Sequence, residues 1–298
     1  MYPVPSAAGR GRFGEREMET FRYQDLSIRY VRSGAGRPVV LLHNGGTSHA
    51  IWDDVTPLLG GFEVFALDLL GFGASSKPGH GYELENHVAI LGAFVDALGL
   101  APVDLVGNCM GSATSLAFAM RRPEAVRAMV LINTLTAGTF AKGIYAPMYG
   151  LPQRAPALVA AMSKVALGAR LGKYGVRSQL GRYGIERRIH ERPELCGCYA
   201  GSSQSRGLLE VLADIPNYAV LDRFEPPPGF PPICTIWGLE NRVLRAEQGR
   251  ALVRTLRPAR QEWLEGCGHL PMLERPERVA EIVRDFLGTE SSHERSGA

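Results

Sequence analysis

Val103–Gly111 reads VDLVGNCMG and runs directly into Ser112–Met120, SATSLAFAM. The start of the first segment is a continuous apolar run, typical of a strand buried on both faces of a sheet, and the second segment has helical spacing. Between them, Gly107 and Gly111 allow a sharp turn without Cβ clashes, with Cys109 at its tip. The helix directs backbone N–H groups and the positive end of its dipole at Cys109, which favours the thiolate.

Short Val/Ile/Leu runs recur along the chain and predict further buried strands. They are Val39–Leu42, Val64–Leu67, Val103–Val106, Met129–Ile132, Ile233–Ile236 and a weaker Glu262–Leu264. Segments of helical period lie between them, namely Glu83–Leu98, Ser112–Met120, Glu247–Leu256 and Pro276–Leu287. Ahead of them, Phe21–Val31 alternates like an antiparallel edge hairpin. This alternation predicts an α/β fold with a mostly parallel central sheet and flanking helices.

Residues 134–217 break the alternation, because no strand pattern is found there and Gly and Pro are scattered among short helical patches. We expect an inserted helical lid at 134–217, on a core formed by residues 19–133 and 218–287. Residues 1–18 and 288–298 are poor in the apolar groups that offset ordering entropy, so we expect a flexible leader and a flexible tail.

Composition excludes several classes of protein. The 298 residues are 45% apolar and 21% charged, which is typical of a globular protein, and 33 Lys+Arg against 30 Asp+Glu give no charge signature of a nucleic-acid binder. The five cysteines lack paired CxxC spacing, which favours a reducing compartment and no metal. No signal peptide, membrane-length apolar stretch, phosphate loop or GxGxxG is found. We therefore expect a cytoplasmic protein with no membrane span and no cofactor.

Five motifs, in order along the chain, resemble those of the α/β-hydrolase superfamily over about residues 20–287. They are His43-Asn44-Gly45-Gly46 with Trp52-Asp53 following, Asp68–Ser75 (DLLGFGAS), the G-x-C-x-G turn, Trp237–Asn241 (WGLEN) and Gly266–His269 (GCGH). In that family the turn is the nucleophile elbow and the last motif delivers the catalytic histidine. The resemblance implies the α/β-hydrolase fold and attack on an ester, thioester or related carbonyl. It also implies that Asp68 and Ser75 brace loops.

Two positions depart from the family's usual pattern. Cys109 stands where the commonest member has Ser, and Asn241 stands where the family usually has Asp, so the triad reads Cys109, His269, Asn241. A thiol has a reference pKa near 8.5, about 5 or more units below that of a hydroxyl, so the histidine needs less help from a carboxylate. We expect Asn241 to orient His269 by accepting its N–H through the amide oxygen. Glu240, one residue away, is an alternative acid.

The resemblance also suggests the residues around the nucleophile. The backbone N–H groups of Gly45 and Met110 are expected to form the oxyanion hole, and a plain tight turn is the alternative for Gly45. Candidate substrate-pocket residues are Asn44, Trp52, Phe140, Tyr145 and Met148. Ordinary packing between lid and core is an equally good interpretation of the larger ones.

These features predict acyl-group chemistry on a small-molecule acyl substrate, through an acyl thioester on Cys109. The reaction that these features favour is hydrolysis of an ester or thioester. The main alternative is transfer of the acyl group to an amine, alcohol or thiol, or cyclisation onto one. A non-catalytic binding protein is a third reading, and the sequence alone does not distinguish a natural Cys109 or Asn241 from an engineered one. The expected lid holds 11 Lys+Arg against 5 acids, which would attract an acyl carrier protein or a coenzyme A thioester, or would be a solvated face.

Overall fold

The computed structural model describes residues 17–148, 150–162, 168–199 and 201–293. Its strands form one eight-stranded sheet in the order β1-β2-β4-β3-β5-β6-β7-β8. The strands are β1 (Met18–Tyr23), β2 (Leu26–Gly34), β3 (Arg37–Leu42), β4 (Phe62–Leu67), β5 (Val103–Asn108), β6 (Val126–Ile132), β7 (Ile233–Gly238) and β8 (Arg260–Leu264). The β1–β2 and β2–β4 pairs are antiparallel and the others are parallel. The predicted strands, the edge hairpin and the mostly parallel sheet are confirmed.

Strand residues alternate between two apolar clusters, one on each face of the sheet. Val40 and Leu42 of β3 pack with α1 (Leu84–Ala97), α2 (Met110–Arg121) and α11 (Ala246–Leu256). Val39 and Leu41 pack on the other face, with α13 (Pro276–His293) and the 3-10 helix η1 (His49–Trp52). Because both faces are covered, the strands read as continuous apolar runs, which is why the sequence pattern revealed them.

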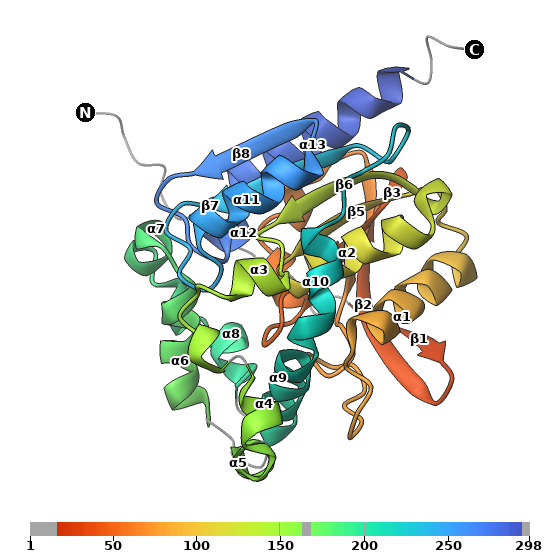
Figure 1. The fold of residues 1–298 in the computed structure, drawn as a ribbon. Helices are drawn as coiled ribbons and strands as arrows, with labels where there is room; N and C mark the ends of the chain where they lie inside the picture. The colour runs from red at the N-terminus through yellow and green to blue at the C-terminus, as the bar shows by residue number, and fades with distance from the viewer. Residues whose placement is uncertain (1–16, 149, 163–167, 200, 294–298) are drawn as a thin grey trace.

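Short helices fill the described part of residues 134–217, called the helical insert below, and no strand is found in that part. They are α3 (Ala137–Phe140), η4 (Ala146–Met148), α4 (Leu151–Arg154), α5 (Pro156–Met162), α6 (Gly168–Gln179), α7 (Arg182–Glu186), η5 (Ile189–Glu191), α8 (Pro193–Gly197), α9 (Ser202–Asp214) and the start of η6 (Ile215–Tyr218). Figure 1 shows these helices, green to teal, gathered to one side of the sheet. After η6, α10 (Ala219–Asp222) leads back to the core.

Two predicted boundaries differ from the structure. Met18, placed in the leader, already pairs with Val31 in the β1–β2 hairpin, and residues 1–16 lie outside the described residues. The expected tail begins too early, because α13 continues to His293. A helix, once formed, adds a backbone hydrogen bond with each residue, so it extends past the end of its apolar pattern. None of the described helices combines the length and apolar character of a membrane span.

The remaining elements connect the core. They are η2 (Thr56–Leu58), η3 (Pro123–Ala125) and α12 (Pro271–Glu274). Among them α12 matters for the site, because it follows the loop that carries His269.

Candidate active site

Cys109 lies between β5 and α2, at the tip of the turn that the sequence predicted. Its φ of 54° is in the left-handed region, which is disfavoured for a residue with a Cβ and typically costs about 1–3 kcal/mol. The turn is held by the Cys109 N–H donating to the Ile132 carbonyl at 2.9 Å and by the close approach of α2 to β3. A Cβ on Gly111 would collide with the Leu42 carbonyl oxygen, which explains the glycine there.

The backbone N–H groups of Gly45 and Met110 lie near enough to the Cys109 sulfur to lower the pKa of its thiol. Burial nevertheless raises the pKa of the Cys109 thiol to about 12, and the two N–H groups only partly offset this. The expectation of a favoured thiolate is therefore wrong for the resting site. The side chain is only 8% exposed in an apolar cluster, and removal from water outweighs the helix dipole there.

His269 lies in the loop between β8 and α12 and is fully buried. Burial lowers the pKa of its imidazole to about 3. Its carbonyl accepts from the amides of Asn108 and Asn133, at 3.3 Å and 3.2 Å, so two residues at the ends of β5 and β6 fix the loop. Within the described residues no hydrogen bond joins the Cys109 sulfur to His269. Burial thus favours the neutral thiol and the neutral imidazole over an ion pair.

Asn241 contacts His269, but with the opposite polarity to the predicted one. Its Oδ1 accepts the backbone N–H groups of Val243 and Leu244, each at 3.0 Å. The amide nitrogen therefore faces His269 and lies 3.1 Å from Nδ1. An amide nitrogen donates only, so Nδ1 must accept and the neutral ring carries its proton on Nε2.

Glu240, the alternative acid, lies elsewhere. Its carboxylate accepts the backbone N–H of Arg182 at 2.8 Å and pairs with the Arg182 guanidinium at 3.5 Å. No hydrogen bond joins it to His269 among the described residues. The structure thus places Asn241, and not Glu240, beside the histidine.

The helical insert contacts the loop that carries Gly45. Asn44 is only 1% exposed, and its side chain accepts from Thr47 Oγ1 at 2.7 Å and donates to Gln179 Oε1 at 3.2 Å. Asn44 was predicted to line the pocket, but its polar atoms are engaged in this network. A Cβ on Gly45 would lie 3.3 Å from Leu208 of α9, so the insert also packs directly on this loop.

The other predicted pocket residues divide between the two clusters. Phe140 is buried in the cluster that contains Cys109, and Tyr145 and Met148 pack partly buried against that cluster. Trp52 is fully buried in the cluster on the opposite face of the sheet. Trp52 comes shortly after the His43–Gly46 loop in the sequence, but the structure places its side chain in the core and not beside Cys109.

Several site residues carried no sequence signal that singled them out. Tyr218 is fully buried, and its hydroxyl has no partner within the described residues. Burial raises the pKa of its phenol, and the negative charges of Asp214 and of a Cys109 thiolate add to this rise. Gln179 reaches the site from a distant segment. Asn108 could have been found, because it ends a buried strand whose carboxyl end lies beside that of the next strand at one edge of the sheet. Asn133, at the end of that next strand, was noted in the sequence as the position where some relatives carry an alternative acid. The described ranges hold no group of three or more metal-ligating side chains.

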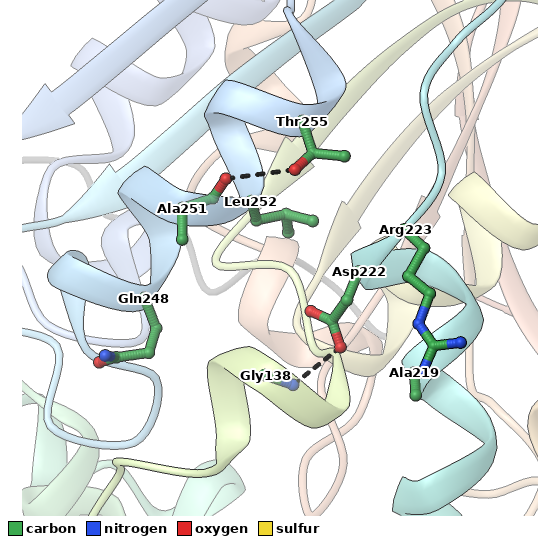
Figure 2. Close-up of a pocket in the computed structure, with 8 residues that line it drawn as sticks. All are labelled: Gly138, Ala219, Asp222, Arg223, Gln248, Ala251, Leu252 and Thr255. Atoms are coloured by element: carbon green, nitrogen blue, oxygen red, sulfur yellow. Dashed lines mark hydrogen bonds between the residues drawn. The ribbon is translucent and has the colours of Figure 1, made fainter.

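A separate cleft of about 360 Å³ lies between α3, α10 and α11. Figure 2 shows Asp222 of α10 turned toward α3, where it accepts the Gly138 N–H at 2.9 Å, with Gln248 of α11 on the far side. Asp222 is thus engaged in fixing the start of the insert. None of Cys109, His269 and Asn241 lines this cleft.

Residues 37–276 match the family model described as alpha/beta hydrolase fold. The 2-hydroxy-6-oxo-2,4-heptadienoate hydrolase of Pseudomonas putida is 31% identical over 265 residues, which are 86% of this chain and 91% of the relative. A haloalkane dehalogenase of Agrobacterium fabrum is 42% identical over 109 residues, 36% of either chain.

Solved structures show the same architecture. A thermophilic esterase from Thermogutta terrifontis has a TM-score of 0.77 at 19% identity and covers 92% of this chain and 99% of its own. A bacterial membrane phospholipase A has a TM-score of 0.76 at 24% identity, over 92% of this chain and 86% of its own. At this level of identity the likeness concerns the fold.

Proposed function

We propose that this chain, which belongs to the α/β-hydrolase fold family, is a hydrolase that attacks the carbonyl carbon of an ester or thioester with Cys109. One observation carries the proposal: two backbone N–H groups, from Gly45 and Met110, lie near enough to the Cys109 sulfur to lower the pKa of its thiol. A carbonyl oxygen placed beside that sulfur would meet the same two donors. Such preorganised donors stabilise the oxyanion that develops during attack on a carbonyl.

The proposed reaction has two steps, acylation of Cys109 and hydrolysis of the acyl thioester. The Cys109 sulfur bonds to the carbonyl carbon while its proton passes to His269, and the oxyanion is held by the Gly45 and Met110 N–H groups. Collapse breaks the bond to the leaving group, which takes the proton from His269 and leaves an acyl thioester on Cys109. Water then adds to the thioester carbon and gives a proton to His269. The carbon–sulfur bond breaks, the Cys109 sulfur takes that proton from His269, and the carboxylic acid is released.

The Asn241 contact makes both proton transfers to His269 difficult. Nε2 is the nitrogen left for the nucleophile, and it accepts a proton only when the ring proton sits on Nδ1. That tautomer would set two N–H donors, on Nδ1 and on Asn241, facing each other at 3.1 Å. We therefore propose slow turnover. An amine or thiol acceptor needs less base than water does, so transfer of the acyl group is the alternative outcome of the second step.

A second candidate reaction comes from the comparisons. The relative that matches over 91% of its length is named for hydrolysis of 2-hydroxy-6-oxo-2,4-heptadienoate. Hydrolysis of such a compound breaks a carbon–carbon bond next to a ketone, which also begins with a carbonyl carbon and forms an oxyanion. The Gly45 and Met110 donors would serve either substrate.

An acyl carrier protein or a coenzyme A thioester is a candidate acyl donor, attracted by the basic insert. Part of that charge is already paired, because Arg182 contacts Glu240, Arg188 contacts Glu191 and Arg192 contacts Asp54. A small thioester and a coenzyme A thioester of the same acyl chain therefore belong together in the test. A clear preference for the second would support recognition by the insert.

The experiment is intact-protein mass spectrometry after exposure to activated esters, thioesters and 2-hydroxy-6-oxo-2,4-heptadienoate, beside Cys109→Ala. An acyl adduct that requires Cys109 supports covalent catalysis, and its clearance by water or by an added amine or thiol distinguishes hydrolase from transferase. Turnover of the dienoate with no adduct favours the carbon–carbon hydrolase. Absence of adduct and of turnover on every compound contradicts the proposal and favours a binding protein.

A further inference from the structure

Gln179, the last residue of α6, contacts both loops of the proposed active site. Its Oε1 accepts from Asn44 Nδ2 at 3.2 Å and its Nε2 donates to the Tyr199 hydroxyl at 2.9 Å. Its main-chain carbonyl accepts the His269 N–H at 2.6 Å. Gln179 is 5% exposed, so these contacts are shielded from water. A single residue of the helical insert thus joins the loop before Gly45 to the loop of the histidine.

The contact with the histidine loop is backbone against backbone. A Cβ on Gly181 would lie 2.5 Å from the Gly266 carbonyl oxygen, and a Cβ on Gly268 would collide with the Gln179 carbonyl oxygen. The Glu274 carboxylate accepts a backbone N–H from each of the two segments, from Gly268 at 2.8 Å and from Gly181 at 3.0 Å. Segments this close cannot slide past each other, so the insert is fixed to the histidine loop here.

The contact with the oxyanion loop passes through side chains. Asn44 is held between Thr47 and Gln179, and Gln179 is in turn held by Tyr199. Gly45, whose N–H reaches the Cys109 sulfur, is the next residue after Asn44. Only the Gln179 side chain connects Asn44 to the insert by hydrogen bonds within the described residues. Loss of that side chain would remove the hydrogen-bonded link between Asn44 and the insert, while the packing of Leu208 on Gly45 and the backbone contact at His269 would remain.

We propose that Gln179 is a positioning residue, through which the helical insert fixes the oxyanion loop relative to the histidine loop. The inference rests on the proposed function, because it assigns Gly45 to the oxyanion hole. On this side of the site the insert is a part of the catalytic centre and does not open as a lid. Substrate must then enter past another part of the insert.

The test compares Gln179→Leu, Gln179→Glu and, as a matched control, Gln248→Leu. Leucine keeps the bulk of Gln179 and removes its side-chain hydrogen bonds, whereas glutamate still accepts from Asn44 and from the Tyr199 hydroxyl. Gln248 undergoes the same substitution on α11, beside the separate cleft of Figure 2. We expect Gln179→Leu to lower kcat about 10- to 100-fold at a nearly unchanged KM, because a small displacement of a catalytic group has an effect of that size. Gln179→Glu should recover most of the loss, and Gln248→Leu should show none.

Amide hydrogen exchange provides a readout that does not need activity. Backbone amides of residues 44–47 should exchange at least about tenfold faster in Gln179→Leu than in the unmodified chain, and should not change in Gln248→Leu. Unchanged exchange at residues 44–47 overturns the inference, even if the chain acylates no compound and the proposed function fails. A rise in KM at constant kcat, or equal losses in the leucine and glutamate variants, also overturns it.

Discussion

Asn241→Asp replaces the amide nitrogen that faces His269 Nδ1 with a carboxylate oxygen. In the present structure the backbone N–H groups of Val243 and Leu244 donate to Asn241 Oδ1, each at 3.0 Å. One carboxylate oxygen of the aspartate would keep these two hydrogen bonds, so the new side chain fits without a change in its position. The oxygen 3.1 Å from Nδ1 would accept a proton there. His269 would then hold its proton on Nδ1, and Nε2 would become an acceptor for the thiol proton.

The expected gain follows from the strength of that one hydrogen bond. A hydrogen bond to a charged group contributes about 1.5–3 kcal/mol, which corresponds to about 1–2 units in the pKa of His269 at 1.36 kcal/mol per unit. The fraction of Cys109 present as thiolate, and the rate of its acylation, should rise about 10- to 100-fold. In a serine triad, replacement of the aspartate by asparagine lowers kcat about 10⁴-fold, because the histidine then holds its proton on the wrong nitrogen. We expect a smaller effect here, because a thiol depends less on the base than a hydroxyl does.

The assay measures the second-order rate of Cys109 alkylation by iodoacetamide between pH 5 and pH 10, and the rate of acylation by the best ester. Glu240→Gln is the control, because the Glu240 carboxylate contacts Arg182 and not His269. We expect a faster reaction below pH 8 in Asn241→Asp and the unmodified profile in Glu240→Gln. An Asn241→Asp profile that coincides with the unmodified one would refute the reasoning from the tautomer.

Two further predictions concern stability, and urea unfolding measures both. Burial lowers the pKa of three histidines, to about 4 for His43, about 4 for His87 and about 3 for His269. Because the unfolded chain takes up protons on these histidines below pH 6.5 and the folded chain does not, their contribution to stability is complete above pH 6.5 and is lost as pH falls. Burial raises the pKa of Glu274 to about 7, so its contribution has the opposite sign, present below pH 4.5 and lost as pH rises through 7. From pH 7.5 to 5.5 the free energy of unfolding should fall by about 2 kcal/mol, and by about 4 kcal/mol in Glu274→Gln; a rise in the unmodified chain would contradict these assignments. Tyr218→Phe should raise the free energy of unfolding by about 1 kcal/mol, because the buried hydroxyl has no partner in the described residues, and a comparable fall would mean that the hydroxyl is bonded.

The core and the turn that carries Cys109 could be predicted because their signals are local. Buried parallel strands such as Val39–Leu42 are apolar throughout, and Gly111 is required by its contact with Leu42. Asn241 and His269 were also found from local motifs. The polarity of their contact was not, because it depends on two backbone N–H groups, of Val243 and Leu244, whose directions exist only in the folded chain.

Charge state and long-range contacts are the other features that the sequence did not reveal. The thiolate expected from the helix dipole is opposed by burial among residues from many elements, which no local motif records. Gln179 reaches Asn44 across 135 residues of sequence. Trp52 lies next to loop motifs but packs on the opposite face of the sheet. In each case the deciding interaction is made by the tertiary structure.

The two departures from the family pattern are physically linked. Asn241 stands where a carboxylate would place a charge beside His269, and the thiol of Cys109 needs less help from such a charge because it is more acidic than a hydroxyl. Burial favours the uncharged forms of Cys109 and His269 as well. An uncharged site avoids the desolvation penalty that a carboxylate would incur among these apolar side chains. In the proposed mechanism the activation of Cys109 is weakened in return, so that stabilisation of the oxyanion by the Gly45 and Met110 N–H groups would supply more of the rate. The placement of the oxyanion loop by Gln179 thus matters more here than it would beside a carboxylate-supported histidine.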